Sequence, residues 1–351
     1  MTGSGIATVA RQEFRLRIRA GRWKWLLGSF FAVLLTFTAL LDSGLGNVAD
    51  ARAGKGAILY GGLMLFVLGL ALLVVPALAA QSVNGDRERG TLATLQVTLL
   101  TPAEIVLGKF VAAWGTALVF LALTLPLVLY AMTQGGVPLS RVVVVTLVLA
   151  LLLGTVCAIS LWLSSVLTRT TTSGVLAYLA VFALTVGTVI LFGLATAVTT
   201  EQVTQTVDAP CPPGDSLCTP GSGRQSFETT QVRTDRTWWL LAANPFVVLA
   251  DASPQRSDPD PARIPGISSD DLDPLGAIGR GVRELRRPPG DSQGTAVLQP
   301  EPDVGGDEQA QPPVWPTGLA VNVALGGAAL VLTTRRLRTP SRTLPRGQRV
   351  A

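Results

Sequence analysis

Residues 81–109, QSVNGDRERGTLATLQVTLLTPAEIVLGK, form a charged island between two long apolar segments. Asn84 and Gly85 predict the end of a helix, because both residues tolerate the left-handed conformation that closes a last turn. Residues 101–104, TPAE, predict the start of the next helix: the threonine can cap it, proline fits its first position and the glutamate completes a capping box. The island therefore has a sharp boundary on each side.

Leucines recur between these two boundaries at helical spacing: Leu92, Leu95 and Leu99. This spacing predicts a short amphipathic helix across the ends of the neighbouring apolar segments. The alternative is a solvated loop in which the leucines are incidental, because short periodic patterns are weak signals.

The composition is that of a membrane protein, since 48% of the 351 residues are hydrophobic and only 15% are charged. A helix needs about 20 apolar residues to cross a bilayer, and six segments approach or exceed that length. They are Trp25–Leu41, Ala57–Ala80, Phe110–Met132, Val142–Leu167, Gly174–Val198 and Val314–Thr334. The first is short and its ends are uncertain. Pro76 and Pro126 lie within predicted spans, where proline permits a kink.

Residues 6–22 predict an amphipathic helix at the membrane surface. Ile6, Ala10, Phe14 and Ile18 form an apolar stripe, and arginines that would meet anionic lipid form a second stripe on the same helical period: Arg11, Arg15, Arg19 and Arg22. A targeting presequence is the alternative, but no small-residue cleavage site follows. A second basic cluster follows the last span, so both ends should be cytoplasmic. Arg52, Lys55 and Arg141 then fall outside, against the trend.

The connection at 200–313 is rich in proline, aspartate and glycine, which predicts a largely irregular extracellular loop. Trp238–Asp251 is the apolar exception. It is too short to span and is split by an Asn-Pro pair, so it should lie at the outer interface or re-enter it. Cys211 and Cys218 could form a disulfide if this loop faces an oxidising exterior. Cys157 lies in the fourth span and is a packing residue.

Several activities are disfavoured by residues that the sequence lacks. There is no histidine, and the six predicted spans contain no Asp, Glu, Lys or Arg, which disfavours an ion-coupled carrier or channel. The nearest fragment to a phosphate-binding Walker sequence is Leu107-Gly108-Lys109, which lacks the first glycine and the final Ser/Thr. No nucleophile–base pair or metal-ligand cluster is recognisable. Energy for transport would therefore come from a partner.

The residues DRERGTL at 86–92 and LTPAEIVLGK at 100–109 resemble the cytoplasmic segment after the second span of ABC type-2 transporter permeases. The resemblance extends to the basic N-terminal helix and the six-span layout, and covers most of the chain except roughly 200–313. It implies that this segment is a coupling helix docked on a separate ATP-hydrolysing subunit. ATP and magnesium would bind that partner, and this chain would hold no cofactor. The resemblance implies these coupling residues: Asp86, Arg87, Glu88, Arg89, Gly90, Thr91, Leu92, Leu95 and Leu99.

We therefore expect an all-α polytopic membrane protein with six transmembrane helices, and five regions. They are a cytoplasmic helix at 1–24, five spans at 25–199 with the coupling segment 81–109, the extracellular loop 200–313, the last span 314–334 and a basic tail 335–351. The expected function is the permease subunit of an ATP-driven exporter in the cell membrane, paired with an identical or similar second half. The alternative is a membrane-anchored sensor or binding protein that acts through the 200–313 loop.

Overall fold

The structure is a computed structural model, and it describes residues 3–19, 21–46, 55–88, 101–208, 224–253, 273–286 and 312–338. Among these described residues, six helical segments are long and apolar enough to cross a membrane, which confirms the predicted number. They are Trp23–Gly46, Lys55–Asp86, Pro102–Thr133, Leu139–Val166, Thr170–Val198 and Trp315–Leu337. The first is longer than predicted. The chain is thus an all-α polytopic membrane protein that also carries a small β-hairpin.

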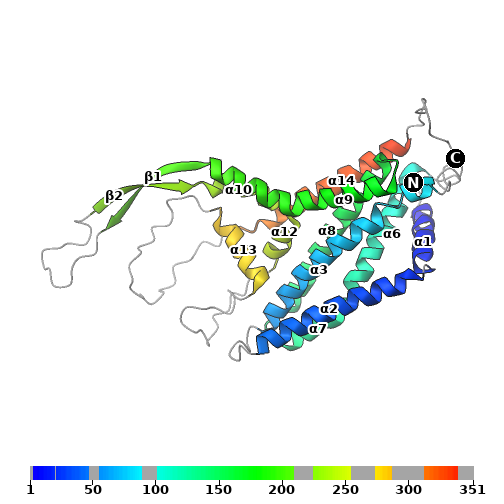
Figure 1. Cartoon of the computed structure of the whole chain (residues 1–351), viewed down its shortest axis with the longest axis horizontal. Helices are drawn as coiled ribbons and strands as arrows, with labels where there is room; N and C mark the ends of the chain where they lie inside the picture. The colour runs from blue at the N-terminus through cyan, green and yellow to red at the C-terminus, as the bar shows by residue number, and fades with distance from the viewer. Residues whose placement is uncertain are drawn as a thin grey trace.

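The spans run back and forth between two ends of one bundle (Figure 1). The helices are α2 (Arg22–Gly46), α3 (Lys55–Ala79), α6 (Pro102–Ala122), α7 (Leu125–Thr133), α8 (Leu139–Val166), α9 (Thr170–Phe182), α10 (Thr188–Val198) and α14 (Trp315–Arg338). We call the end where both termini lie the junction end. The opposite end, from which a β-hairpin projects, is the hairpin end.

The core of the bundle is built around α8, with α3 and α6 against it, and these are the three most buried spans. Small residues allow the helices to approach one another closely. Gly326 of α14 lies against Thr155, and Gly154 of α8 lies against the Trp114 side chain. The Trp114 indole donates a hydrogen bond to the Ala150 carbonyl at 2.8 Å. The spans formed by α2 and by α9–α10 are mostly exposed, as expected for helices whose apolar surface faces lipid or another membrane subunit.

Two prolines and a π-helical turn shape the spans. Pro76 lies inside α3 without breaking it, whereas Pro126 is the second residue of α7, which follows a break at Leu123 and Thr124. A five-residue π-helical turn, η1 (Ala183–Gly187), joins α9 to α10. The predicted helix end at Asn84-Gly85 is wrong: α3 ends at Ala79, and these two residues instead begin the short helix α4 (Asn84–Glu88). The next section gives the contact responsible.

The N-terminal helix α1 (Gly3–Arg19) confirms the predicted helix, and it packs along α6. Val9 is buried in this contact, and the helices approach so closely that a Cβ on Gly108 would lie 2.6 Å from the Val9 Cβ. Arg11, Arg15 and Arg19 remain exposed on another face of α1. The contact with α6 therefore leaves these three arginine side chains exposed.

The described parts of 200–313 hold more regular structure than the sequence predicts, and the rest of this connection lies outside the described residues. Thr200–Asp208 (β1) and Arg224–Val232 (β2) form an antiparallel hairpin in which Thr200 pairs with Val232. Four short helical elements follow: η2 (Thr234–Arg236), α11 (Trp239–Ala242), α12 (Pro245–Asp251) and α13 (Pro274–Glu284). The hairpin pattern was missed because its strands are mainly polar.

The turn between α11 and α12 lies deep against the spans, in keeping with the predicted re-entrant element. The Asn244 side chain caps α12 and donates hydrogen bonds to the Thr185 carbonyl and the Thr188 hydroxyl, at 2.6 and 2.9 Å. Thr188 is ten residues from the end of α10, which corresponds to a depth of about 15 Å. On the other side, Asn322 of α14 donates to the Ala243 carbonyl at 3.2 Å. The π-helical turn therefore supplies a backbone carbonyl, that of Thr185, which accepts a hydrogen bond from Asn244 in the turn between α11 and α12.

Candidate functional site: the charged junction

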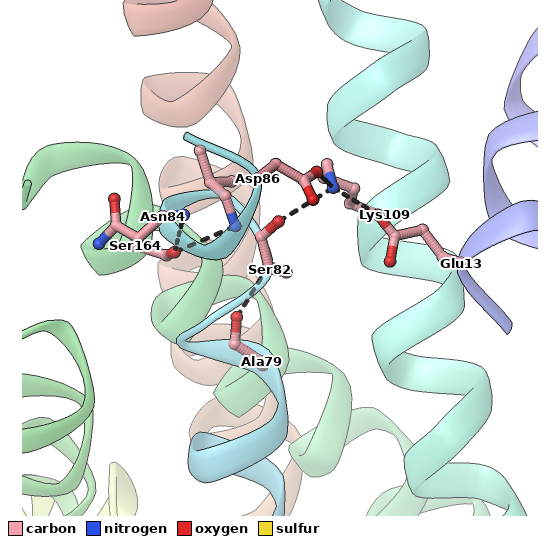
Figure 2. Close-up of polar contacts among 8 residues, drawn as sticks. Glu13, Ala79, Ser82, Asn84, Asp86, Lys109 and Ser164 are labelled. Carbon is pink, nitrogen blue, oxygen red and sulfur yellow. Dashed lines mark hydrogen bonds and ion pairs between the residues drawn. The ribbon is translucent and has the colours of Figure 1, made fainter. Parts of the chain in front are cut away.

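Lys109, eight residues into the third span, is a buried cation that sequence reasoning placed at the edge of the charged island. Its side chain is only 1% exposed. The Nζ atom forms ion pairs with Glu13 of α1 and Asp86 of α4, and donates a hydrogen bond to the Ser82 carbonyl at 2.9 Å (Figure 2). We call Glu13, Ser82, Asp86 and Lys109 the charged junction. It joins three segments that are far apart in the sequence.

The start of α6 is fixed by the predicted capping box, which the structure confirms. The Thr101 hydroxyl accepts from the Glu104 backbone N–H at 3.4 Å, and the Glu104 carboxylate accepts from the Thr101 N–H at 2.8 Å. Gly108 then lets α1 approach, which brings Glu13 to Lys109. The sequence TPAEIVLGK therefore sets both the start of α6 and the position of the buried cation.

The chain between α3 and α4 is held by serines of the neighbouring helices. The Ser164 hydroxyl of α8 accepts hydrogen bonds from the Val83 and Asn84 backbone N–H groups, each at 3.2 Å. The Ser173 hydroxyl of α9 donates to the Ala80 carbonyl at 3.0 Å. These contacts satisfy backbone groups that would otherwise be orphaned at a helix boundary. They explain why Asn84 begins α4 instead of ending α3.

Glu88 links α4 to the fifth span. Its carboxylate accepts a hydrogen bond from the Thr170 backbone N–H, at 3.2 Å, where α9 begins. A carboxylate at a helix N-terminus satisfies an open donor and complements the helix dipole. The five residues of α4 are thus connected to α1 and α6 through Lys109, to α8 through Ser164 and to α9 through Glu88.

Arg17 extends the polar contact between α1 and α6. Its guanidinium donates to the Thr116 hydroxyl at 3.1 Å. Burial lowers the pKa of Arg17 from its usual value, and the charge of nearby Glu13 opposes that shift. Within the junction, two carboxylates face one lysine, so removal of the lysine would leave two like charges together.

The structure covers only part of the predicted coupling segment. Asp86 and Glu88 lie in the contacts described above, and the backbone of Arg87 lies in α4. The remaining coupling residues lie outside the described part of the chain: Arg89, Gly90, Thr91, Leu92, Leu95 and Leu99. Cys211 and Cys218 also lie outside it, whereas Cys157 is buried in α8 as predicted.

Sequence reasoning missed Glu13 and Lys109 as members of the site. Glu13 offered a signal, because it is the sole acidic residue among the first 41 and lies in an arginine-rich helix. The predicted third span began at Phe110, so the lysine before it was assigned to the charged island and not to a buried site. The six predicted spans carry no charge, but the helices extend beyond them, and Glu104, Lys109 and Arg141 are buried within those extensions.

The charged junction connects helices through ion pairs. Among the described residues, no group of three or more His, Cys, Asp or Glu side chains could hold a metal ion. Ion pairs at low exposure are strong and geometrically specific, so a displacement of α4 would be passed to the helices that it contacts.

The comparisons with known proteins agree with this arrangement. Residues 7–278 match the family described as ABC-2 family transporter protein, and that match contains most of α1, the charged junction and the first five spans. No curated protein matches the chain. The match covers well over half of the sequence, and it favours a transporter over a membrane-anchored sensor. The chain therefore belongs to the ABC-2 family of transporter proteins and is a multi-pass ABC transporter permease.

Proposed function

We propose that this permease is driven by ATP-hydrolysing subunits on separate chains, and that it exports its substrate as one of two membrane halves, identical or similar. The observation that supports this most is the charged junction. It ties α4 to the N-terminal helix and to α6, and the contacts of Ser164 and Glu88 beside it tie α4 to α8 and α9. ATP and magnesium belong to the partner ATPase in this proposal.

The coupling segment divides into two parts in this proposal. Asp86 and Glu88 transmit force, because both carboxylates are engaged by groups of this chain. The segment also meets the ATPase: the charges at 86–89 hold register with it, and Leu92 and Leu95 supply apolar docking. Charged contacts at an interface set specificity more than affinity, so the leucines contribute more to complex stability.

Transmission follows from the contacts of α4. When the ATPases close, they push on the segment 86–99. Asp86 then moves Lys109 of α6 and, through it, Glu13 of α1. Glu88 and Ser164 carry the same displacement to α9 and α8. Helix α1 acts as a lever at the membrane surface, and the pathway between the two halves changes its accessible side.

The proposed orientation places the junction end in the cytoplasm and the hairpin end outside the cell membrane. Helix α1 and the last turns of α14, with Arg335 and Arg336, lie at the junction end (Figure 1), and basic residues favour the cytoplasmic side of a span. Arg52, Lys55 and Arg141 oppose this orientation, and two of them pair with a nearby carboxylate. Lys55 pairs with Asp42 at 2.7 Å, and Arg141 pairs with Asp273. A cysteine at position 257 should react with an impermeant reagent in intact cells, whereas one at 348 should not.

The test of the proposal is co-purification of the stand-alone ATPase with this chain. Leu92→Asp combined with Leu95→Asp puts two charges into the docking surface, and each uncompensated charge costs several kcal/mol. We expect loss of the ATPase, while the spans keep their fold because they satisfy their own backbone groups. Glu88→Ala is the milder comparison: it should leave the complex partly assembled and weaken coupling. A double variant that retains the ATPase and full ATP turnover would contradict the proposal.

A further inference from the structure

Helix α1 packs on α6 through the side that carries the apolar stripe predicted to meet the membrane. Val9 is buried in this contact, and a Cβ on Gly108 would lie 3.1 Å from the Ile6 carbonyl oxygen. Ala10 and Phe14, which belong to the same apolar stripe, are partly buried. The contact with α6 therefore takes up most of this stripe, and a different face of α1 is left to meet the surroundings.

Three arginines follow one another on that other face, one on each successive turn: Arg11, Arg15 and Arg19. The helical period places them roughly opposite Val9 and Glu13, which lie on the side that faces α6. All three arginine side chains are exposed. Within the described part of the chain, none of the three forms an ion pair with a carboxylate. Their charge is therefore not balanced by an ion pair with any of these residues.

A hollow of about 380 Å³ lies over the three arginines. The described residues that line it all belong to α1, and we call them the arginine face: Thr8, Arg11, Gln12, Arg15, Leu16 and Arg19. None of these six residues carries a carboxylate, whereas three carry a guanidinium, which forms charge-assisted hydrogen bonds with phosphate. The arginine face therefore suits an anionic ligand that presents a phosphate group.

Exposed apolar side chains beside the arginine face indicate where that phosphate comes from. Leu16 and Ile18 are 60% and 46% exposed, and Trp25, in the first turn of α2, is 83% exposed. The start of α2 follows α1 directly at the junction end (Figure 1). Exposed tryptophan and apolar residues next to arginines are typical of the membrane–water interface, where the arginines meet anionic headgroups. A soluble anion would give no reason for this apolar border.

We propose that the arginine face of α1 binds anionic phospholipid headgroups in the leaflet at the junction end, and that this binding holds α1 on α6. The pairs Arg11–Arg15 and Arg15–Arg19 are like charges four residues apart, which oppose the helix, and an anionic headgroup relieves this repulsion. Glu13, on the side that faces α6, pairs with Lys109. Anionic lipid on one side of α1 therefore supports the charged junction on the other.

The first arm of the test measures lipid preference of the full-length chain in vesicles of phosphatidylcholine with an equal amount of phosphatidylglycerol. The three native cysteines are replaced by serine or alanine, Ile18→Cys carries a fluorophore, and one lipid at a time carries a quencher. Phosphatidylglycerol should quench more strongly than phosphatidylcholine. Each arginine near an anionic surface favours association roughly fivefold, so replacing all three by glutamine should lower the preference roughly a hundredfold.

Two comparisons show that the preference belongs to the arginine face. Arg236→Gln removes the same charge at the hairpin end, where the side chain is 56% exposed, and should leave the preference unchanged. High salt should weaken the preference of the unsubstituted face, because exposed charges are screened. Equal quenching by both lipids, or a preference that survives the triple glutamine variant, would overturn the site.

The second arm measures hydrogen exchange of residues 3–19 in vesicles with and without phosphatidylglycerol. Relief of two like-charge pairs should slow exchange in α1 about two- to fivefold when phosphatidylglycerol is present. The triple glutamine variant should show no such difference, and exchange in α8 should be the same in both vesicles. Exchange in α1 that ignores phosphatidylglycerol would overturn the role of lipid in holding α1. Neither arm contains an ATPase, so failure of the proposed function would leave both results unchanged.

Discussion

Replacement of Lys109 by methionine is the sharpest perturbation of the charged junction. Methionine keeps the length and apolar stem of lysine, so the change removes the charge with little change in volume. It leaves Glu13 and Asp86 facing each other, with side chains 20% and 18% exposed. Removal of one partner from a buried ion pair costs about 3 to 5 kcal/mol, and the partial exposure of the carboxylates points to the lower end, about 3 kcal/mol.

The assay is thermal unfolding of the detergent-purified chain. By the scaling for soluble domains, the loss of about 3 kcal/mol in the free energy of unfolding corresponds to a drop in Tm of roughly 5 to 10 °C. Combining Lys109→Met with Glu13→Gln and Asp86→Asn should recover most of the loss, because no unpaired charge remains. Lys55→Met is the matched control. Its pair with Asp42 is about one quarter exposed on each side, so it should cost less than about 1 kcal/mol. A Lys109→Met protein as stable as the Lys55→Met control would refute the reasoning.

Three further predictions concern other parts of the chain. Gly108→Ala should separate α1 from α6 and expose α1 to limited proteolysis, whereas Gly115→Ala, where the added Cβ meets open space, should not. At the hairpin base, hydrogen bonds from Arg233 lower the pKa of Asp235, so this contact stabilises above the usual aspartate pKa and is lost as pH falls through the lowered value. The protection of residues 224–232 against hydrogen exchange should therefore fall as the pH drops below the usual aspartate pKa and through this lowered value. Cys211 and Cys218 should be joined in non-reducing mass mapping, and two free thiols in protein prepared without reductant would dispose of that bridge.

Much of the fold follows from periodicity and length. Six apolar segments predict six spans because a bilayer sets the length of a helix, and TPAE at 101–104 predicts a helix start because its capping box is local. The end of α3 was misjudged because a tertiary contact decides it: the Ser164 hydroxyl of α8 binds the backbone at Val83 and Asn84. Local signals at Asn84-Gly85 could not reveal a partner about eighty residues away.

The charged junction could be predicted only in part, for the same reason. Asp86 and Glu88 were found through the resemblance of the whole segment, but their partners lie on other helices. Lys109 was placed at the end of the charged island because charge usually marks the end of a span. Its burial depends on Glu13, and that pairing depends on Gly108 letting α1 approach. The pairing of Arg141 could not be predicted, because its counter-charge, Asp273, lies 132 residues later in the sequence.

The central claim is that the charged junction transmits the work of the ATPase to the spans. Its most direct test is ATP turnover of the reconstituted complex in which Asp86 is replaced by asparagine, with Asp42→Asn as the control at the hairpin end. Lys109 keeps Glu13 in this variant, and the docking leucines are untouched. The account predicts that Asp86→Asn retains its ATPase but loses most of the transport-dependent turnover, while Asp42→Asn keeps it. Full transport-dependent turnover by the Asp86→Asn complex would contradict the account.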